Sequence, residues 1–341
     1  MIMKTAWRSS ARTPESDIYM SIDQLPEGLA KFECGGDVKY AGYPITVQNL
    51  RSHPIHNFLP EGDINPPTPV LHRLILGTVG RPLWEYTSDF DLLAGFRDAL
   101  QAHKALCDQG ILHRDISAGN VLLTKTQNTP LRGFLTDLEF ARIASSTLSK
   151  PRVIVTSVIG PQNRYDDRGR VVSKTEPTTR THTTFESTVT VKRGAGMTGT
   201  AQFMARRILL QEVQGTTRVV HEATHDVESF VWVLSYCVMR KLYLRASQQS
   251  APKEVRNQCH AFRLLFRQAF GQTSSMAIAT ERQSGSYALE FPTLHRVVSD
   301  IIANFMSDTL VVLFKDLQGL IHRAQDPFNP TPLTHDALLA V

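Results

Sequence analysis

The stretch Ile111-Leu112-His113-Arg114-Asp115-Ile116-Ser117-Ala118-Gly119-Asn120-Val121-Leu122-Leu123 decides the interpretation of this sequence. It places a carboxylate, Asp115, five residues before a carboxamide, Asn120, and an apolar run lies on each side. This spacing lets one short loop carry both a proton acceptor and a metal ligand. The alternative interpretation is a polar turn before a buried strand.

A helix is predicted immediately before this loop. Side chains that would share one helical face recur along the preceding segment: Leu92, Phe96, Leu100, His103 and Cys107. Ser88 is the predicted N-cap, and Gly110 is the residue that stops the helix. The helix therefore leads the chain directly to His113.

A hairpin is predicted after the loop. Residues 121–124 and 133–136 have the pattern of short strands, and the turn-forming Gln127-Asn128-Thr129-Pro130 lies between them. Because a hairpin brings its two ends together, Asn120 and Asp137 are expected to lie side by side. Two oxygen ligands in this position suit Mg²⁺, although a turn aspartate is the alternative for Asp137.

Length and composition limit the class of protein. The chain has 341 residues, of which 42% are hydrophobic and 20% charged, so it can bury a large core. The formal net charge is +5, but Lys and Arg are spread along the chain, and nucleic-acid binding is not expected. The four cysteines lie far apart, which argues against a zinc site or a disulfide framework: Cys34, Cys107, Cys237 and Cys259.

The sequence also predicts where the protein works. The widely spaced cysteines favour a reducing compartment, so we expect an intracellular protein in the cytoplasm or the nucleus. No basic and then apolar signal segment opens the chain. The longest apolar stretch, 230–239, is about half of what would span a bilayer, so a soluble protein with no membrane partner is expected.

The amino-terminal part is predicted to contain few regular elements. Residues 5–70 are rich in turn signals, among them Gly35-Gly36, with short candidate strands such as 43–47. Residues 71–79 have the pattern of a buried strand, which Gly80-Arg81-Pro82 is expected to end.

The carboxyl-terminal part is predicted to be mainly helical. Residues 144–197 are rich in Ser, Thr and Arg and are expected to form a mobile loop, with at most an edge ribbon over 181–191. A buried helix is expected over 224–240, with Asp226 at its start, and a polar insertion over 246–290. Amphipathic helices are expected at 292–306 and 310–321, followed by an extended segment and a short last helix.

These residues carry a resemblance to the fungal-type protein kinase domain, a divergent branch of the eukaryotic protein-kinase-like superfamily. His113-Arg114-Asp115 with Asn120 resembles the catalytic loop, in which four residues separate the Asp and the Asn. Asp137-Leu138-Glu139 resembles the Mg²⁺-binding triplet. Gly199-Thr200 through Met204-Ala205 resembles the end of the activation segment.

The resemblance extends to both ends of the chain. His225-Asp226-Val227-Glu228-Ser229-Phe230 resembles the start of the central helix, whose Asp supports the catalytic loop in kinases. Lys4-Thr5-Ala6-Trp7, with Arg12 and Glu15, resembles the lysine strand and the glutamate helix. The similarity therefore covers nearly the whole chain.

The resemblance implies a role for each of these residues. Lys4 would hold the α- and β-phosphates of ATP and pair with Glu15, and Asn120 and Asp137 would hold Mg²⁺. Asp115 would orient and deprotonate the hydroxyl of a protein substrate, assisted by His113 and Arg114 in the same loop. Arg114 also offers a fork for a phosphate on the 144–197 loop, added by an activating kinase or by autophosphorylation.

Three departures from the kinase pattern bear on activity. Leu138 and Glu139 stand where kinases generally have Phe and Gly, which removes the backbone freedom of the glycine. Ser117 stands where serine/threonine kinases usually have a Lys. Arg207 stands where kinases have the acid of the Ala-Pro-Glu triplet, so the anchoring of the activation segment is expected to differ.

The implied fold is α+β and bilobal, like that of protein kinases. Residues 1–80 would form a small β-rich lobe, truncated because no glycine-rich loop precedes Lys4, and 81–341 a mainly helical large lobe. Insertions are placed at 144–197, the activation segment, and at 246–290. We expect the chain as written to bind ATP weakly, and a version extended upstream by about 50 residues, enough for two strands and a turn, to bind it better.

Three functions remain open at this stage. An active protein serine/threonine kinase is favoured by the intact Asp115, Asn120 and Asp137. A pseudokinase or scaffold that binds partners is favoured by Arg207 and by the missing phosphate loop. A small-molecule kinase of the choline or aminoglycoside type shares the spacing from acid to amide but lacks a long activation loop.

Overall fold

The computed structural model describes residues 1–51, 68–125, 130–143, 154–159, 163–165, 171–174, 178–182, 201–214, 220–283, 285–293 and 295–341. The chain forms two compact units. The first consists of Met1–Arg142 with Arg193–Val341, and the second of Ile143–Lys192.

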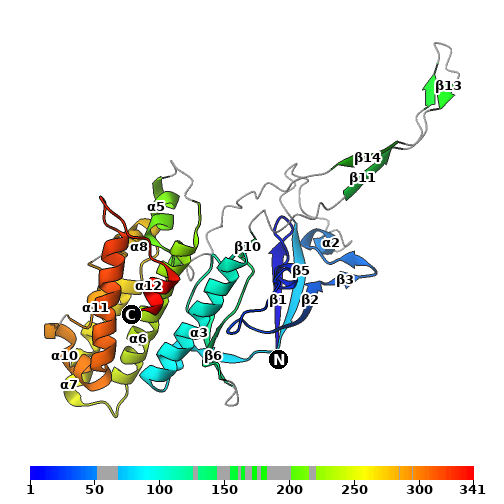
Figure 1. Cartoon of the computed structure of the whole chain (residues 1–341). Coiled ribbons are helices and arrows are strands. Elements are labelled where there is room, and N and C mark those ends of the chain that lie inside the picture. The colour runs from blue at the N-terminus through cyan, green and yellow to red at the C-terminus, as the bar shows by residue number, and fades with distance from the viewer. Residues whose placement is uncertain are drawn as a thin grey trace. The chain divides into compact units, whose positions relative to one another are not determined.

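The amino-terminal sheet of the first unit has the strand order β1-β5-β2 (Figure 1). Its strands are β1 (Ile2–Ser9), β5 (Pro69–Leu76) and β2 (Phe32–Asp37), and both outer strands run antiparallel to β5. Helix α1 (Glu15–Met20) packs near β2. The register pairs Lys4 with Leu74, and Leu74 is fully buried in the sheet.

Two turn predictions in this region are wrong. Gly35 and Gly36 lie inside β2, where the Gly35 Cα faces the Leu74 side chain so closely that a Cβ would clash. Gly80–Pro82 forms strand β6 instead of ending a strand. The segment around 43–47 contains the ribbon β3 (Lys39–Tyr40) and β4 (Tyr43–Pro44), followed by helix α2 (Val47–Arg51).

Helix α3 (Asp89–Asp108) confirms the helix predicted before the loop. The Ser88 hydroxyl accepts a hydrogen bond of 3.1 Å from the Asp91 amide, so Ser88 is the N-cap. Gly110, with φ of 75°, follows the helix and turns the chain into β7 (Ile111–Leu112). A short 3-10 helix, η2 (Leu83–Glu85), precedes α3.

The predicted hairpin is confirmed as β8 (Val121–Thr124) and β9 (Gly133–Leu135), which form a sheet with β6 in the order β6-β8-β9. Helix α3 packs directly on it, since Gly95 and Gly133 meet with no room for a Cβ on Gly133. Asp98 accepts a hydrogen bond of 2.7 Å from the Arg132 amide. The hairpin is therefore fixed against the helix that precedes the loop, and β10 (Arg142–Ile143) follows it.

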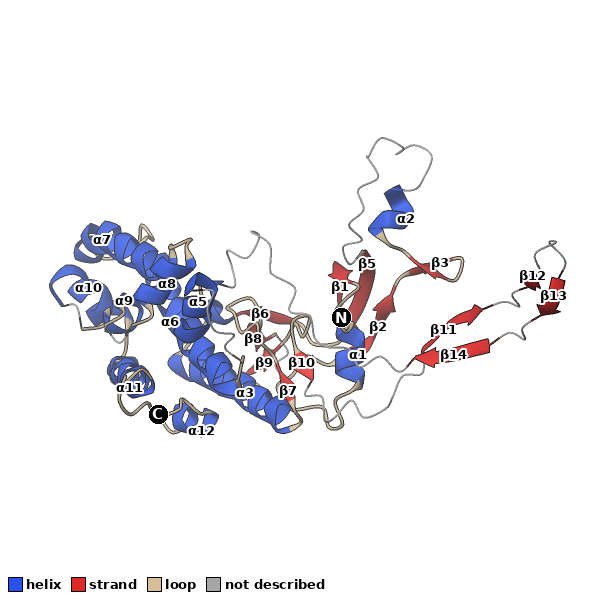
Figure 2. Ribbon diagram, turned by 90° about the horizontal axis from the view of Figure 1, so that it is seen from above, coloured by secondary structure: helices blue, strands red, loops and turns tan. Residues whose placement is uncertain are grey.

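The part of the first unit that follows residue 201 is helical (Figure 2). Its central helix, α6 (Ala223–Ala246), buries Phe230, Trp232, Leu234 and Val238, as predicted. Among the described residues it is followed or preceded by α5 (Arg206–Gln214), α7 (Lys253–Phe270), α8 (Ser275–Glu281), α9 (Tyr287–Glu290), α10 (His295–Phe305), α11 (Asp308–Ala324) and α12 (His335–Leu339).

The range 246–290, expected as a polar insertion, is helical and has a buried apolar face. Helices α7, α8 and α9 occupy this range, and Val255, Phe262 and Phe270 on α7 are buried. These apolar residues recur every seven or eight positions, which is a helical face, and the polar composition reflects only the solvent side. Pro292 lies in a turn before α10 instead of in its first helical turn.

The second unit contains two antiparallel ribbons. Strand β11 (Ile154–Ile159) pairs with β14 (Thr178–His182), and β12 (Asn163–Tyr165) pairs with β13 (Val171–Lys174). We predicted a loop here with at most a ribbon over 181–191. The ribbons instead begin at Ile154, and residues 183–191 lie outside the described residues.

Small sheets and a mainly helical carboxyl-terminal part together make an α+β fold like that of protein kinases, as the sequence predicted. Within the described ranges, no helix has an apolar stretch long enough to cross a bilayer.

Candidate active site

Lys4 of β1 lies among three carboxylates. Its Nζ donates to Glu15 Oε2 and Asp137 Oδ1, each at 2.8 Å, and lies 3.2 Å from Glu139 Oε2. Burial alone would lower the pKa of Lys4, but the negative charges of Asp137 and Glu15 outweigh it and raise the pKa above its usual range. The ammonium is therefore charged. The kinase resemblance implied its pairing with Glu15, whereas its contact with Asp137 was not predicted.

Glu15 links the sheet to the Asp137-Leu138-Glu139 triplet. It is the first residue of α1 and is 4% exposed. One carboxylate oxygen accepts from Lys4, and the other accepts from the Leu138 amide at 2.9 Å. Burial raises the pKa of Glu15, and the Lys4 charge opposes that rise. Strand, helix and triplet thus meet at one buried carboxylate.

The 111–123 loop is held by the fully buried His113. Its Nε2 donates to the Thr136 carbonyl at 3.0 Å, and its Nδ1 accepts from the Asp115 amide at 3.3 Å. Burial is the main cause that lowers the pKa of His113, which favours the neutral ring that this donor and acceptor pattern requires. His113 therefore fixes the backbone on both sides of the site and lies too deep to contact a substrate.

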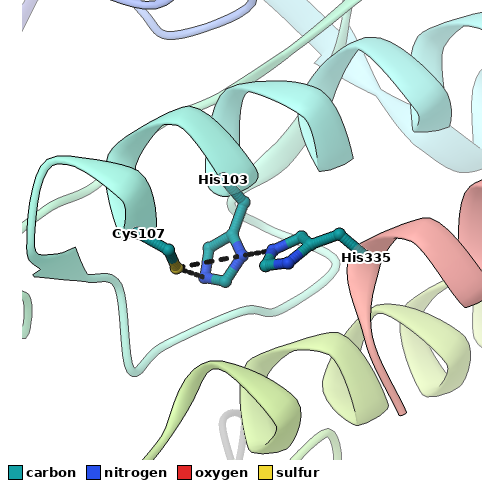
Figure 3. A group of neighbouring side chains, drawn as sticks. All are labelled: His103, Cys107 and His335. Atoms are coloured by element: carbon teal, nitrogen blue, oxygen red, sulfur yellow. Dashed lines mark hydrogen bonds between the residues drawn. The ribbon is translucent and has the colours of Figure 1, made fainter.

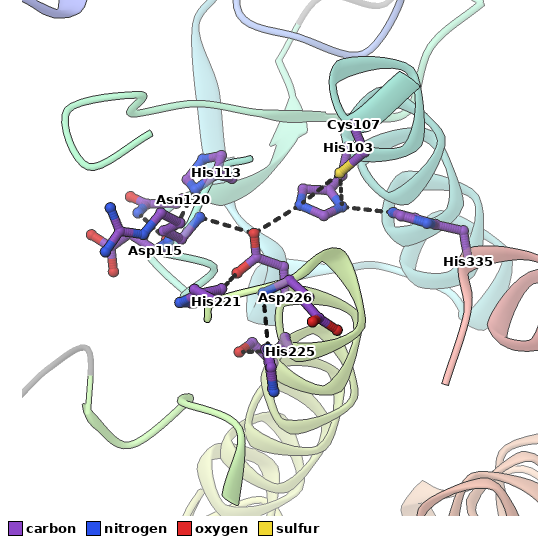
Figure 4. A network of polar contacts seen from close by, with 12 residues as sticks. His103, Cys107, His113, Asp115, Asn120, His221, His225, Asp226 and His335 are labelled. Carbon is purple, nitrogen blue, oxygen red and sulfur yellow. Dashed lines mark hydrogen bonds and ion pairs between the residues drawn. The ribbon is translucent and has the colours of Figure 1, made fainter. Parts of the chain in front are cut away.

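Asp226 supports the same loop from α6, as predicted (Figure 4). Its Oδ2 accepts from the Arg114 amide at 2.9 Å and from His103 Nε2 at 3.0 Å, and its Oδ1 accepts from His221 Nε2 at 2.7 Å. Burial alone would raise the pKa of Asp226, but the hydrogen bonds from His103 and His221 hold it far below its usual range. A buried, ionised carboxylate thus holds the residue before Asp115.

Asn120 and Asp137 lie at the two ends of the hairpin. The Thr136 amide donates to the Asn120 carbonyl at 2.9 Å, so the residue that precedes Asp137 is hydrogen-bonded to Asn120. The Asn120 side-chain amide donates to the Asp115 carbonyl at 2.8 Å, so its oxygen is the atom that can bind a cation. Amide and carboxylate oxygens, as these two residues carry, are ligands that suit Mg²⁺.

Glu139 adds a third acid to this region. Oxygens of Glu15, Asp137 and Glu139 all lie within 4.8 Å of one another. In the comparison with kinases, Glu139 was noted only because it stands where kinases have a glycine. Its contact with Lys4 was not predicted from the sequence. The signal available was only an acid placed two residues after Asp137.

Two residues of the site have backbone angles that side chains other than glycine rarely adopt. Arg114 has φ of 66° and Asp137 has φ of 69°. Such conformations cost roughly 1–3 kcal/mol and persist where surrounding contacts hold them. Here the contacts are the Asp226 carboxylate on the Arg114 amide and the Lys4 ammonium on the Asp137 side chain. Two of the three described non-glycine residues with positive φ thus belong to the candidate site, and the third, Ala41, lies in the turn between β3 and β4.

The segment after residue 201 has an anchor that sequence reasoning missed. The Arg206 amide donates to Glu228 Oε1 at 2.9 Å, and Arg282 Nη2 donates to the Gln202 carbonyl at 2.5 Å. Arg282 is fully buried, and its guanidinium lies 4.7 Å from the centre of the Trp232 ring. Glu228 of α6 therefore anchors this segment. The segment is held even though Arg207 has the opposite charge to the acid that kinases have at that position. Gly199 and Thr200 lie outside the described residues.

Taken together, a lysine strand, a glutamate helix, a His-Arg-Asp loop and an Asp after a hairpin define the protein kinase class of fold. Sequence comparison identifies the branch. The profile of the fungal protein kinase family matches residues 1–158 and 178–238, and the chain belongs to that family. Among proteins with curated functions, none is detectably similar to this chain.

Proposed function

We propose that this protein is a serine/threonine protein kinase that transfers the γ-phosphate of ATP to a hydroxyl of a protein substrate. The observation that carries the proposal is the convergence of Lys4, Glu15 and Asp137, which come from β1, α1 and the segment after β9. Protein kinases need this ion pair and this Asp together for phosphoryl transfer.

Each residue has a defined task in this proposal. Lys4 binds the α- and β-phosphates, and Glu15 keeps its ammonium aimed at the site. Asn120 and Asp137 hold Mg²⁺, with Glu139 near enough to contribute. When bound, Mg²⁺ neutralises the charge of the phosphates and of the leaving group.

The transfer step uses Asp115. The substrate hydroxyl oxygen forms a bond to the γ-phosphorus as the bond to the ADP oxygen breaks, and the hydroxyl proton passes to the Asp115 carboxylate. Arg114 and His113 act through the backbone, since Asp226 holds the Arg114 amide and Thr136 holds the His113 ring. Catalysis depends on placement and charge, because phosphoryl transfer needs little covalent chemistry from the protein.

A kinase-like binding protein without transferase activity is the second candidate. The observation that favours it is the crowding of Lys4 by three carboxylates, because these acids compete with phosphates for the same ammonium. One assay distinguishes the two candidates. The purified protein is incubated with radiolabelled ATP, Mg²⁺ and a generic acceptor such as myelin basic protein, and label on the acceptor is measured. Label on Ser or Thr, lost in Asp115→Asn, supports the kinase. Binding of MgATP without transfer supports the second candidate.

A further inference from the structure

A chain of hydrogen bonds runs from the carboxyl-terminal helix to the 111–123 loop (Figures 3 and 4). His335, the first residue of α12, places Nε2 2.7 Å from His103 Nδ1 on α3. The other nitrogen of His103, Nε2, lies 3.0 Å from Asp226 Oδ2, and the same oxygen accepts from the Arg114 amide. Three links therefore connect His335 to the Arg114 amide, and the first of them joins residues 232 positions apart in sequence.

The chemistry of the groups sets the direction of the bonds. The Asp226 carboxylate can only accept, so Nε2 of His103 carries the hydrogen that it donates. In the neutral ring Nδ1 is then an acceptor, and His335 must donate to it from Nε2. His103 is fully buried, and His335 is 8% exposed. Loss of the His335 donor would leave a buried nitrogen without its partner, and the His103 ring without its orientation.

A metal ion is the other interpretation of this group, since Cys107 lies beside His103 on α3. Two nitrogens bound to one tetrahedral zinc lie about 3.3 Å apart, given zinc to nitrogen bonds of about 2.0–2.1 Å. The two imidazole nitrogens here are 2.7 Å apart, which is a hydrogen-bond distance. Burial also raises the pKa of Cys107 to about 12, so the sulfur is a neutral thiol and not the thiolate that zinc binds.

We propose that His335 is a positioning residue for the catalytic loop: it orients His103, which orients Asp226, which holds the Arg114 amide next to Asp115. Docking of α12 on α3 is then a condition for an ordered loop, and the carboxyl-terminal helix is part of the working kinase. The consequence for phosphoryl transfer rests on the function proposed above. The consequence for the order of the loop does not.

Three variants isolate the hydrogen bond. His335→Gln keeps a side-chain amide that can donate at the position of Nε2, and His335→Leu has a similar size with no donor. Asp336→Ala is the matched control, because Asp336 is on the same helix and pairs with Lys104 of α3 at the surface. That change removes only a surface ion pair, which contributes little to the docking of α12, and leaves the buried chain of bonds intact.

Hydrogen exchange of the full-length protein, followed by mass spectrometry on peptides covering 111–123, reads out the loop directly. We expect exchange at the Arg114 amide to accelerate about tenfold in His335→Leu, the effect of losing one ordinary hydrogen bond, and to stay within about twofold of wild type in the other two variants. An unchanged loop in His335→Leu, or equal acceleration in His335→Gln, would overturn the proposal. So would tightly retained zinc that is lost in Cys107→Ser.

Kinetics extend the test to transfer. In His335→Leu the kcat is expected to fall about tenfold with the KM for ATP unchanged, because the groups around Lys4 are not part of the chain of bonds. If no variant has transferase activity, including wild type, the kinase proposal fails and the exchange data still decide the role of His335. A fall in kcat that His335→Gln does not rescue counts against positioning.

Discussion

Lys4 and Asp137 are 133 positions apart in the chain, and the Lys4 ammonium donates a hydrogen bond of 2.8 Å to Asp137 Oδ1. This contact joins the amino-terminal sheet to the segment after the hairpin. For Asp137 to bind a cation, its hydrogen bond from Lys4 must weaken or break. Nucleotide and Mg²⁺ would therefore rearrange this ion-pair network when they bind.

Asp115→Asn is expected to reduce transfer by at least about 10²-fold with the fold intact, because the amide keeps the shape of the carboxylate and cannot accept the proton. The rate of label transfer to a generic acceptor measures this, with circular dichroism as the check on folding. Asp316→Asn, on the exposed face of α11, is the matched control. Equal rates in Asp115→Asn and wild type would contradict the catalytic assignment.

Asp137→Ala is expected to weaken Mg²⁺-dependent nucleotide binding more than Asn120→Ala does. A carboxylate contributes a full charge to the cation, and an amide contributes only a dipole. Isothermal titration with MgATP, compared with ATP in EDTA, gives the Mg²⁺-dependent part of the affinity for each variant. The reverse order would indicate a different arrangement of ligands.

Glu139→Gln is expected to have opposite effects with and without Mg²⁺. Without the metal, removing one of three negative charges near Lys4 should tighten ADP binding about fivefold, the Coulomb effect of one charge near 4 Å in water. With the metal, the loss of a nearby carboxylate should reduce or reverse that gain. Titration of ADP under both conditions tests this, and Glu27→Gln at an exposed position is the control. Unchanged ADP affinity in EDTA would show that Glu139 does not compete for Lys4.

Arg282→Ala is expected to destabilise the fold by about 3 kcal/mol or more, because it removes a buried cation from Glu228 and from the Gln202 carbonyl. Arg207→Ala should change stability by less than about 0.5 kcal/mol, because that side chain is exposed. Urea unfolding of both variants measures the two changes. A larger effect at Arg207 would mean that the anchor lies where other kinases have it.

The sequence allowed the 111–123 loop, α3, the hairpin and α6 to be predicted because local signals agree there. Ser88 caps the helix, Gly110 ends it, and apolar residues have a clear period. Helix α7 was missed because its apolar face is narrow, with Val255, Phe262 and Phe270 set among charged residues.

The hydrogen bond from Arg282 to the Gln202 carbonyl, and the one between His335 and His103, could not be predicted from the sequence. They join residues far apart in the chain, and no local pattern marks the partner. Asp137 is also far from Lys4 in the chain, 133 positions away, and only the resemblance to a family placed both residues at one nucleotide site before the structure did.

The stability of the protein is expected to depend on pH through two buried histidines, His225 and His335. Burial, assisted by His221 for the first and His103 for the second, lowers each pKa to about 4. The unfolded chain has histidine pKa values near 6.5, so between about pH 6.5 and pH 4 the unfolded state binds more protons. The contribution of these two neutral rings to the free energy of unfolding is therefore fully present above pH 6.5 and is lost as the pH falls toward 4.

The slope from each histidine is at most about 1.4 kcal/mol per pH unit in that window. Burial raises the pKa of Glu15, Glu228 and Glu281, and these acids act in the opposite direction, so the informative quantity is the difference between variant and wild type. Urea unfolding at pH 7, 6 and 5 should give a flatter pH dependence for His225→Gln and for His335→Gln. His260→Gln, exposed on α7, is expected to leave the slope unchanged. Identical slopes in all four proteins would mean that neither ring is held neutral in the folded state.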